Sequence, residues 1–170
     1  MRHIVSILSE NETGALSRIV GLFSQRGYDI ESLTAAPTEN KKVSRITILT
    51  YVTDEQAEQI TKQLHKLINV IKVSSIIDPN EAVEREVLFI KVHTPTKVMR
   101  EEIKSLCDIF GASIEDVTTD QYILQYVGTS NEIDRFIKII VETTDTIEII
   151  RSGVCSINRG DISLSLKNNI

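Results

Sequence analysis

The sequence predicts an α+β protein of two βαββαβ units, each an antiparallel sheet with two helices on one face. Segments with strand and helix patterns follow one another in this order twice, on either side of a turn-rich junction at residues 78–81. The halves also match in identity, because residues 27–33 (GYDIESL) align with residues 111–117 (GASIEDV) at an offset of 84. We therefore expect a first domain at residues 1–78 and a second at residues 79–170.

The first unit opens with residues 3–9, which alternate and are rich in β-branched side chains, as in a strand. After a loop at residues 10–14, a helix is indicated by the apolar stripe Leu16, Ile19, Val20 and Phe23. Thr13 is its expected N-cap, and Gly27 follows its end. The remaining expected elements are strands at residues 29–35, 43–52 and 70–77 and a helix capped by Asp54.

The second unit repeats this order. Its first helix is expected to begin at Thr94-Pro95 and to end at Gly111, and its second to begin with a capping box of Thr129 and Glu132. The expected strands are residues 86–93, 113–118, 122–127 and 146–157. The tail from residue 158 is polar, and we expect it to be loose.

Composition excludes several classes of protein. A formal net charge of −5 disfavours a protein that binds nucleic-acid phosphates, and no apolar run approaches the length of a membrane helix. We expect a cytoplasmic protein with two buried, reduced thiols, Cys107 and Cys155. The histidines have no metal-spaced partners and read as surface or edge residues, no phosphate-binding or hydrolase motif is present, and no nucleophile stands beside a base. We expect no catalytic residues and no metal site.

The loop before the first helix is the candidate site. The first N–H groups of a helix lack intrahelical partners and attract an anion, and Gly14 lets a ligand approach the backbone. Asn11 offers a donor and an acceptor. If two chains pair edge to edge, Asp29 of one chain can accept from an ammonium at the other chain's loop, beside an apolar wall that includes Ile30. These groups suit an aliphatic amino acid. The alternative is that Gly14 only opens a helix and Asn11 only caps a turn.

The second unit serves as an internal control for this loop. At the offset of 84, Gly14 falls on Val98, and the corresponding stretch reads His93-Thr94-Pro95-Thr96-Lys97. The glycine is absent, and the proline has removed an N–H group. The difference favours a binding function in the first unit only.

The chain resembles the ACT-domain small subunits of acetolactate synthase. The resemblance is carried by ENETGALSRIVGLFSQRGYDIESLTAAPT, SRITI, EQITKQLHKLINVIKV, VERE and RSGVCSINRGD, which extend along nearly the whole chain. It implies a ferredoxin-like ACT domain, then a second ferredoxin-like domain, and a regulatory subunit without an active site. Such subunits activate a catalytic (large) subunit that carries thiamine diphosphate, magnesium and FAD, and they make it sensitive to branched-chain amino acids, usually valine.

The resemblance also implies where the effector lies. In the family it binds between the ACT domains of a homodimer, and the positions that match its contacts here are Asn11, Thr13, Gly14, Ala15, Leu16, Asp29 and Ile30. Family members usually carry Asn where this chain has Asp29. An aspartate can accept from an ammonium, whereas against a carboxylate it would lower affinity about tenfold. Two other readings remain: a free-standing ACT-type amino-acid sensor, and an activating subunit with a weakened feedback site.

Overall fold

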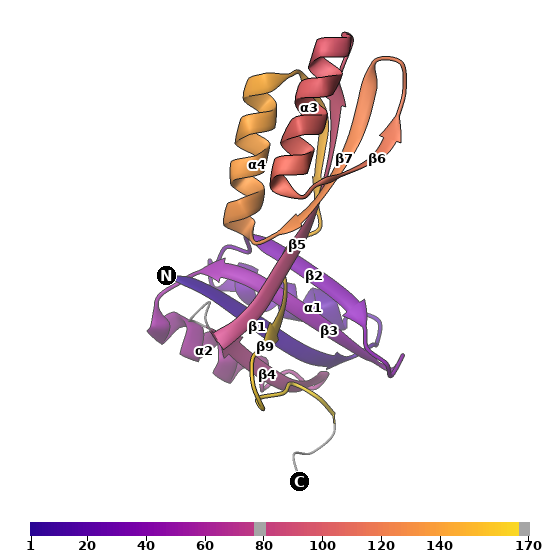
Figure 1. Ribbon diagram of the computed structural model, residues 1–170. Helices are drawn as coiled ribbons and strands as arrows, with labels where there is room; N and C mark the ends of the chain where they lie inside the picture. The colour runs from indigo at the N-terminus through magenta and orange to yellow at the C-terminus, as the bar shows by residue number, and fades with distance from the viewer. Residues whose placement is uncertain (77–80, 167–170) are drawn as a thin grey trace. The chain divides into compact units, whose positions relative to one another are not determined.

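The computed structural model describes residues 1–76 and 81–166, and it divides the chain into two compact units (Figure 1). The first unit combines Met1–Glu84 with Val154–Ile170, and the second is Arg85–Gly153. The expected boundary at residues 78 and 79 lies outside the described residues. The segment after Gly153, which the sequence placed with the second domain, groups with the first unit.

The first unit is built on a four-stranded antiparallel sheet. Its elements are β1 (Arg2–Glu10), α1 (Ala15–Gln25), β2 (Ser32–Pro37), β3 (Val43–Tyr51), α2 (Asp54–Leu64) and β4 (Val70–Ile76). The strands lie in the order β2-β3-β1-β4, which confirms the predicted βαββαβ order. The second strand starts at Ser32 rather than Asp29, and α2 is capped by Thr53, whose hydroxyl accepts from the Gln56 N–H, rather than by Asp54.

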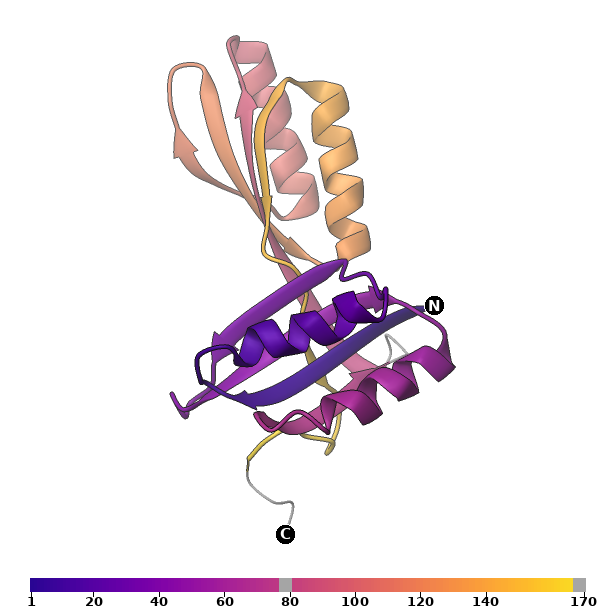
Figure 2. The ribbon, with the colours of Figure 1, turned by 180° about the vertical axis from the view of Figure 1, so that it is seen from behind.

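Helices α1 and α2 cover one face of this sheet (Figure 2). Alternate residues of the central strands point at the helices, since side chains along a strand alternate between faces. Val5 and Ile7 of β1 oppose Ile48 and Ile46 of β3, and all four are buried against the apolar stripes of the helices. The Ile, Val and Leu side chains of the core therefore fix the register, because a slip by one residue would expose them.

The other face of the sheet is covered by the chain's own return. Ile4 and Leu49 form a buried cluster with Ala82 and Val154, and the short strand β9 (Cys155–Asn158) pairs with the start of β5 (Ala82–His93) (Figure 1). The predicted single strand at residues 146–157 is therefore wrong. Gly153, with φ of 77°, breaks it into β8 (Thr146–Arg151) and β9.

The tail beyond residue 158 is also tied to the first unit, contrary to the expectation of a loose end. The Lys72 ammonium donates to the Ser165 carbonyl at 2.6 Å, and the Arg159 guanidinium donates to the Ala82 carbonyl at 3.0 Å. The tail therefore packs through main-chain acceptors, which a sequence pattern does not reveal.

The second unit repeats the topology of the first. Its sheet has the order β6-β7-β5-β8, and its elements after β5 are α3 (Lys97–Phe110), β6 (Ser113–Val117), β7 (Gln121–Gly128), α4 (Ser130–Thr143) and β8. Helices α3 and α4 bury Ile103, Phe136 and Ile140 against the sheet. The Thr129–Glu132 capping box is confirmed, whereas α3 is capped by Thr96 and not by Thr94.

Two expectations about polar side chains were wrong. Cys107 is buried, which raises the pKa of its thiol to about 11, but Cys155 is exposed. His3 is not a surface residue, because its side chain is fully buried with Nε2 3.2 Å from a carboxylate oxygen of Asp54. None of the described helices is long and apolar enough to cross a membrane.

Candidate functional site

The loop between β1 and α1 is fixed by backbone hydrogen bonds at both ends. The Asn11 N–H donates to the Lys42 carbonyl at 2.7 Å, and the Ala15 N–H donates to the Glu12 carbonyl at 3.1 Å. Gly14, not the predicted Thr13, is the N-cap of α1. Its φ of 84° lies in the left-handed region, and no side chain caps the helix. The first turn of α1 therefore starts without the side-chain oxygen that usually accepts from it.

Asn69, just before β4, stabilises the loop through hydrogen bonds of its backbone and its side chain. Its carbonyl accepts from the Glu10 N–H at 2.8 Å, and its side-chain nitrogen donates to the Glu12 carboxylate at 2.9 Å. Its side-chain oxygen accepts from the Arg18 guanidinium. Asn69 is 4% exposed, so one buried amide joins the loop, the first turn of α1 and the end of the sheet. Glu12 is exposed, but its carboxylate is held in this network.

A pocket of about 220 Å³ lies between this loop and the end of β2. Asn11, Ala15 and Leu16 form one side, and Ala35, Ala36 and Pro37 form the other. Ile46 lies at its floor from β3, and Ser9, Glu10, Glu12 and Ser44 complete the lining. The pocket thus joins an apolar wall to a helix N-terminus and a few polar groups, which is the composition of a small-ligand site.

The structure brings together only some of the predicted site residues. Asn11, Ala15 and Leu16 line the pocket, and Thr13 and Gly14 form the adjoining turn. Asp29 and Ile30 precede the opposite end of β2, which is six residues and hence about 20 Å long. Asp29 is exposed and Ile30 packs against the core. Within one chain they do not meet the loop.

The Asn11 side chain shows that the alternative reading was correct in one respect. Its amide nitrogen donates to the Lys41 carbonyl at 3.1 Å, so Asn11 does cap the turn between β2 and β3. This bond fixes the side chain at the rim of the pocket. Among the described residues, no group of three or more His, Cys, Asp or Glu side chains could hold a metal ion.

Comparison with known proteins agrees with this architecture. Residues 5–72 match the model of the AHAS small subunit-like ACT domain, and residues 85–160 match that of the small subunit of acetolactate synthase. The chain belongs to the acetolactate synthase small-subunit family. It is 48% identical to the acetolactate synthase small subunit of Buchnera aphidicola subsp. Schizaphis graminum, over 94% of this chain and 100% of that protein.

Other members of the family are similar over the same length. The isozyme 3 small subunit of Escherichia coli is 47% identical, over 95% of this chain and 98% of that protein. The crystal structure of the small subunit from Thermotoga maritima superposes with a TM-score of 0.87 at 34% identity, over 95% of this chain and 99% of that one. The resemblance read from the sequence, and the fold of an ACT domain followed by a second βαββαβ unit, are confirmed.

In the second unit, an arginine stands at the position that corresponds to Leu16 of the loop pocket. Arg100 stands three residues before the buried Ile103 of α3, as Leu16 stands three residues before Ile19 of α1. The Arg100 guanidinium donates to the Thr94 carbonyl at 3.1 Å and to the Thr119 carbonyl. In the second unit, Arg100 therefore joins the loop to the turn between β6 and β7. The corresponding space in the first unit is the open loop pocket.

Sequence reasoning missed the residues that complete the pocket from a distance. Asn69 and Arg18 support the loop, and Ala36 and Pro37 form the far wall. The polar Asn69 between two apolar residues in Leu67-Ile68-Asn69-Val70 was a usable signal, since a buried amide needs partners. The role of β2 as a wall depends on strand order, which the linear pattern does not contain.

Proposed function

We propose that this chain is the regulatory subunit of an acetolactate synthase. It binds the catalytic large subunit, raises its activity and makes it sensitive to a branched-chain amino acid, with valine as the first candidate. Likeness to named small subunits along almost the whole chain supports this assignment. The observation that carries the regulatory part is the open pocket beside Gly14, which joins a helix N-terminus to an apolar wall and a few polar groups.

The effector site requires a second copy of the chain. β2 is the edge strand of its sheet, with β3 as its partner among the described strands, so its outer edge offers free N–H and C=O groups. Two copies related by a two-fold axis would pair their β2 strands antiparallel. The start of one β2 then lies beside the end of the other. Asp29 of one chain thereby reaches the pocket that Pro37 of the other chain borders.

In this homodimer the effector lies across the interface. Its carboxylate meets the uncapped first turn of α1, where N–H groups and the helix dipole favour an anion. Its ammonium meets Asp29 of the other chain, and its branched side chain lies on Ala15 and Leu16. Asp29 suits this orientation because a carboxylate only accepts hydrogen bonds. With the effector reversed, Asp29 would face the carboxylate and repel it.

Inhibition then follows from linkage. Valine favours one arrangement of the two ACT domains, and the large subunit binds that arrangement differently, with a coupling of about 1–3 kcal/mol. The chemistry belongs to the large subunit, which is the proposed carrier of thiamine diphosphate, magnesium and FAD. This chain contributes no cofactor and no catalytic residue.

Reconstitution tests the proposal. The full chain is mixed with the large subunit from the same source, and acetolactate formation is measured with and without valine. Activation by the chain and inhibition by valine are expected, with inhibition lost and activation kept in Gly14→Asp. Failure to bind any large subunit would favour a free-standing sensor. Activation without inhibition would favour a subunit with a weakened feedback site, and recovery in Asp29→Asn would place the cause at that residue.

A further inference from the structure

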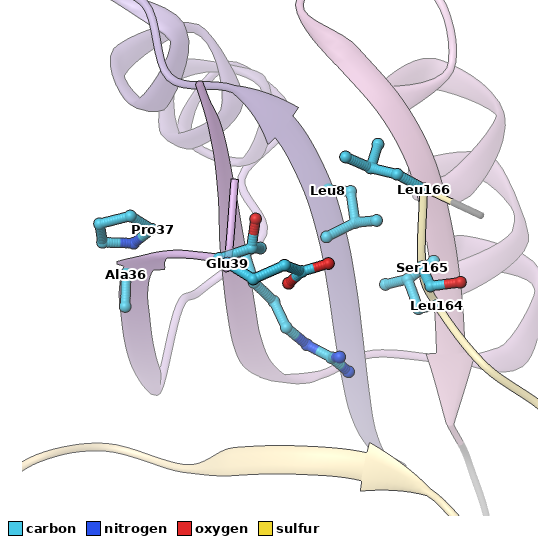
Figure 3. A pocket seen from close by; sticks show the side chains of 9 residues that line it. Leu8, Ala36, Pro37, Glu39, Leu164, Ser165 and Leu166 are labelled. Atoms are coloured by element: carbon cyan, nitrogen blue, oxygen red, sulfur yellow. The ribbon is translucent and has the colours of Figure 1, made fainter. Parts of the chain in front are cut away.

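A second pocket, of about 330 Å³, lies on the face of the first sheet opposite the helices. Leu8 and Arg45 face each other across β1 and β3 and form its floor, Pro37 and Glu39 border it from the end of β2, and Leu164 and Leu166 of the tail close it (Figure 3). All of these residues belong to the first unit. The pocket is therefore built from the sheet and the returning tail alone.

Arg45 carries a positive charge into this pocket, and no ion pair within residues 1–76 and 81–166 neutralises it. The guanidinium is half-buried, burial lowers its pKa, and one of its nitrogens donates to the Ser156 carbonyl at 2.9 Å. No carboxylate within the described part of the chain forms an ion pair with it. A cation removed from water needs a compensating anion. Its remaining donors therefore suit a carboxylate ligand.

Glu39 supplies the opposite charge to the same pocket. Its carboxylate is directed into the space beside Leu8, as Figure 3 shows, and it makes no ion pair with Arg45. Two opposite charges that line one pocket without pairing are complementary to a zwitterion. Between them the walls are aliphatic, from Leu8, Leu164 and Leu166. The combination matches an α-amino acid with an aliphatic side chain.

We propose that this pocket is a second amino-acid site, distinct from the loop pocket. The ligand carboxylate binds Arg45, its ammonium binds Glu39, and its side chain lies among Leu8, Leu164 and Leu166. The assignment stands on these residues and does not depend on feedback through the loop beside Gly14.

The two pockets lie back to back through the end of the sheet. Ala36 and Pro37 line both of them, and Ser44 of the loop pocket is the neighbour of Arg45. A ligand in the second pocket would hold the tail, which the hydrogen bond from Lys72 to the Ser165 carbonyl already fastens to β4. The two pockets therefore share two wall residues but have separate floors and polar groups.

The test is a titration of the full-length chain, labelled with ¹⁵N, by L-valine, followed by amide NMR. Saturable shifts are expected at Glu39, Leu164 and Leu166, with a midpoint separate from that of Asn11 to Leu16. Arg45→Met should weaken the first set roughly ten- to hundred-fold, as expected for loss of a charged hydrogen-bond partner, and should leave the loop set in place. Arg45→Lys, which keeps the charge, should bind L-valine at this pocket with an affinity between those of the native chain and of Arg45→Met. Arg26→Met, an exposed arginine outside both pockets, is the matched control.

A second ligand separates an amino acid from a simple carboxylate. Isovalerate has the same branched chain and carboxylate but no ammonium, so it should bind this site more weakly than L-valine. Glu39→Gln should weaken L-valine and leave isovalerate unchanged. Shifts confined to the loop pocket, or shifts at the tail that persist in Arg45→Met, would overturn the proposal. Equal affinity for both ligands would overturn its assignment to an amino acid.

Discussion

The two units share one topology but differ in the connection between their first strand and their first helix. In the first unit the chain passes through left-handed Gly14 into a helix that no side chain caps, and a pocket remains beside it. In the second, the Thr96 hydroxyl accepts from the Met99 N–H at 3.2 Å, and Arg100 bridges the loop to the next turn. The second unit satisfies internally the groups that the first leaves available.

This difference separates what the fold requires from what a ligand requires. Both sheets form in the order second-third-first-fourth strand, and both second helices begin with a complete capping box, Thr53 with Gln56 and Thr129 with Glu132. An open, uncapped loop is therefore not needed to build the unit. Its presence in one copy only is the strongest structural sign that the first unit binds something at this position.

The largest expected effect comes from filling the loop pocket of the first unit with the side chain that stands at the corresponding position of the second unit. Leu16→Arg places a guanidinium where Arg100 stands in the second unit, within reach of the loop carbonyls. Because the side chain would occupy the ligand's space, valine binding should weaken by roughly a hundredfold or more, equivalent to about 2.7 kcal/mol. Calorimetric titration of the full chain measures this, and activation of the large subunit should survive.

The reciprocal change, Arg100→Leu, is the control for that experiment. It removes the bonds to Thr94 and Thr119, so it should cost about 1–2 kcal/mol of unfolding free energy and leave valine binding unchanged. If Leu16→Arg bound valine normally, the ligand would not use the loop pocket. If Arg100→Leu abolished binding, the two units could not be assigned different roles.

The fold was largely predictable because it depends on local patterns. The alternating residues of β1 predict a strand and the apolar stripe of α1 predicts a helix. The repeat of the element order predicts the same topology for both units. The failures were at positions that depend on distant contacts. The break at Gly153 and the return of Val154 to Ile4 and Leu49 required knowledge of which face of the first sheet was still uncovered.

The site was predictable only in its first half. The loop from Asn11 to Leu16 could be identified because helix starts expose N–H groups, and four of its residues do line the pocket. Asn69 and Arg18 could not be assigned, since their importance comes from a buried network that spans about fifty residues of sequence. Asp29 lies at the far end of β2, and its role stays a prediction about a second chain.

Removal of the Asn69 side chain is expected to have the second-largest effect. Asn69→Ala deletes the acceptor for Arg18 and the donor to Glu12, and the position is 4% exposed. We expect a loss of about 1–2 kcal/mol in urea-induced unfolding and weaker valine binding, because the loop loses its support. Asp145 supplies the equivalent carbonyl in the second unit, to the His93 N–H, but its side chain is exposed. Asp145→Ala should change stability by less than about 0.5 kcal/mol, and a similar loss in both variants would contradict a specific role for Asn69.

Alanine at two glycines, the N-cap of α1 and a residue inside the helix, should change the unfolding free energy in opposite directions. Gly14→Ala forces a side chain into left-handed backbone at φ 84°, which should cost about 1–2 kcal/mol of unfolding free energy. Gly21 lies inside the same helix, and a Cβ there would meet no atom within 4 Å, so Gly21→Ala should stabilise by about 0.5–1 kcal/mol. Thermal unfolding of both variants distinguishes them. Stabilisation by Gly14→Ala would show that the left-handed turn is not needed.

The smallest expected effect is a difference between the two capping boxes in how their contribution to stability depends on pH. In α4 the Glu132 carboxylate accepts from the Thr129 N–H at 2.7 Å and from its hydroxyl at 2.9 Å, and these bonds lower its pKa. In α2 the equivalent residue is Gln56, which accepts from the Thr53 N–H at 2.9 Å and does not titrate. A lowered pKa means that the folded state binds the proton less readily than the unfolded state. The stabilisation by Glu132 is therefore complete above the ordinary glutamate value of about 4.3 and is lost as the pH falls through the lowered value.

Glu132→Gln should flatten this dependence, and Gln56→Glu should create it in the first unit. Because the carboxylate is exposed and screened by solvent, the difference between variant and native chain should be only a few tenths of a kcal/mol between about pH 6 and about pH 3.5. Urea unfolding at each pH measures it. An unchanged pH profile in Glu132→Gln would mean that the box is held by the Thr129 hydroxyl and the Glu132 N–H alone. In that case the two second helices would be capped equally well with or without charge, and the difference in capping between the units would lie at their first helices, where one keeps an open loop and the other an arginine.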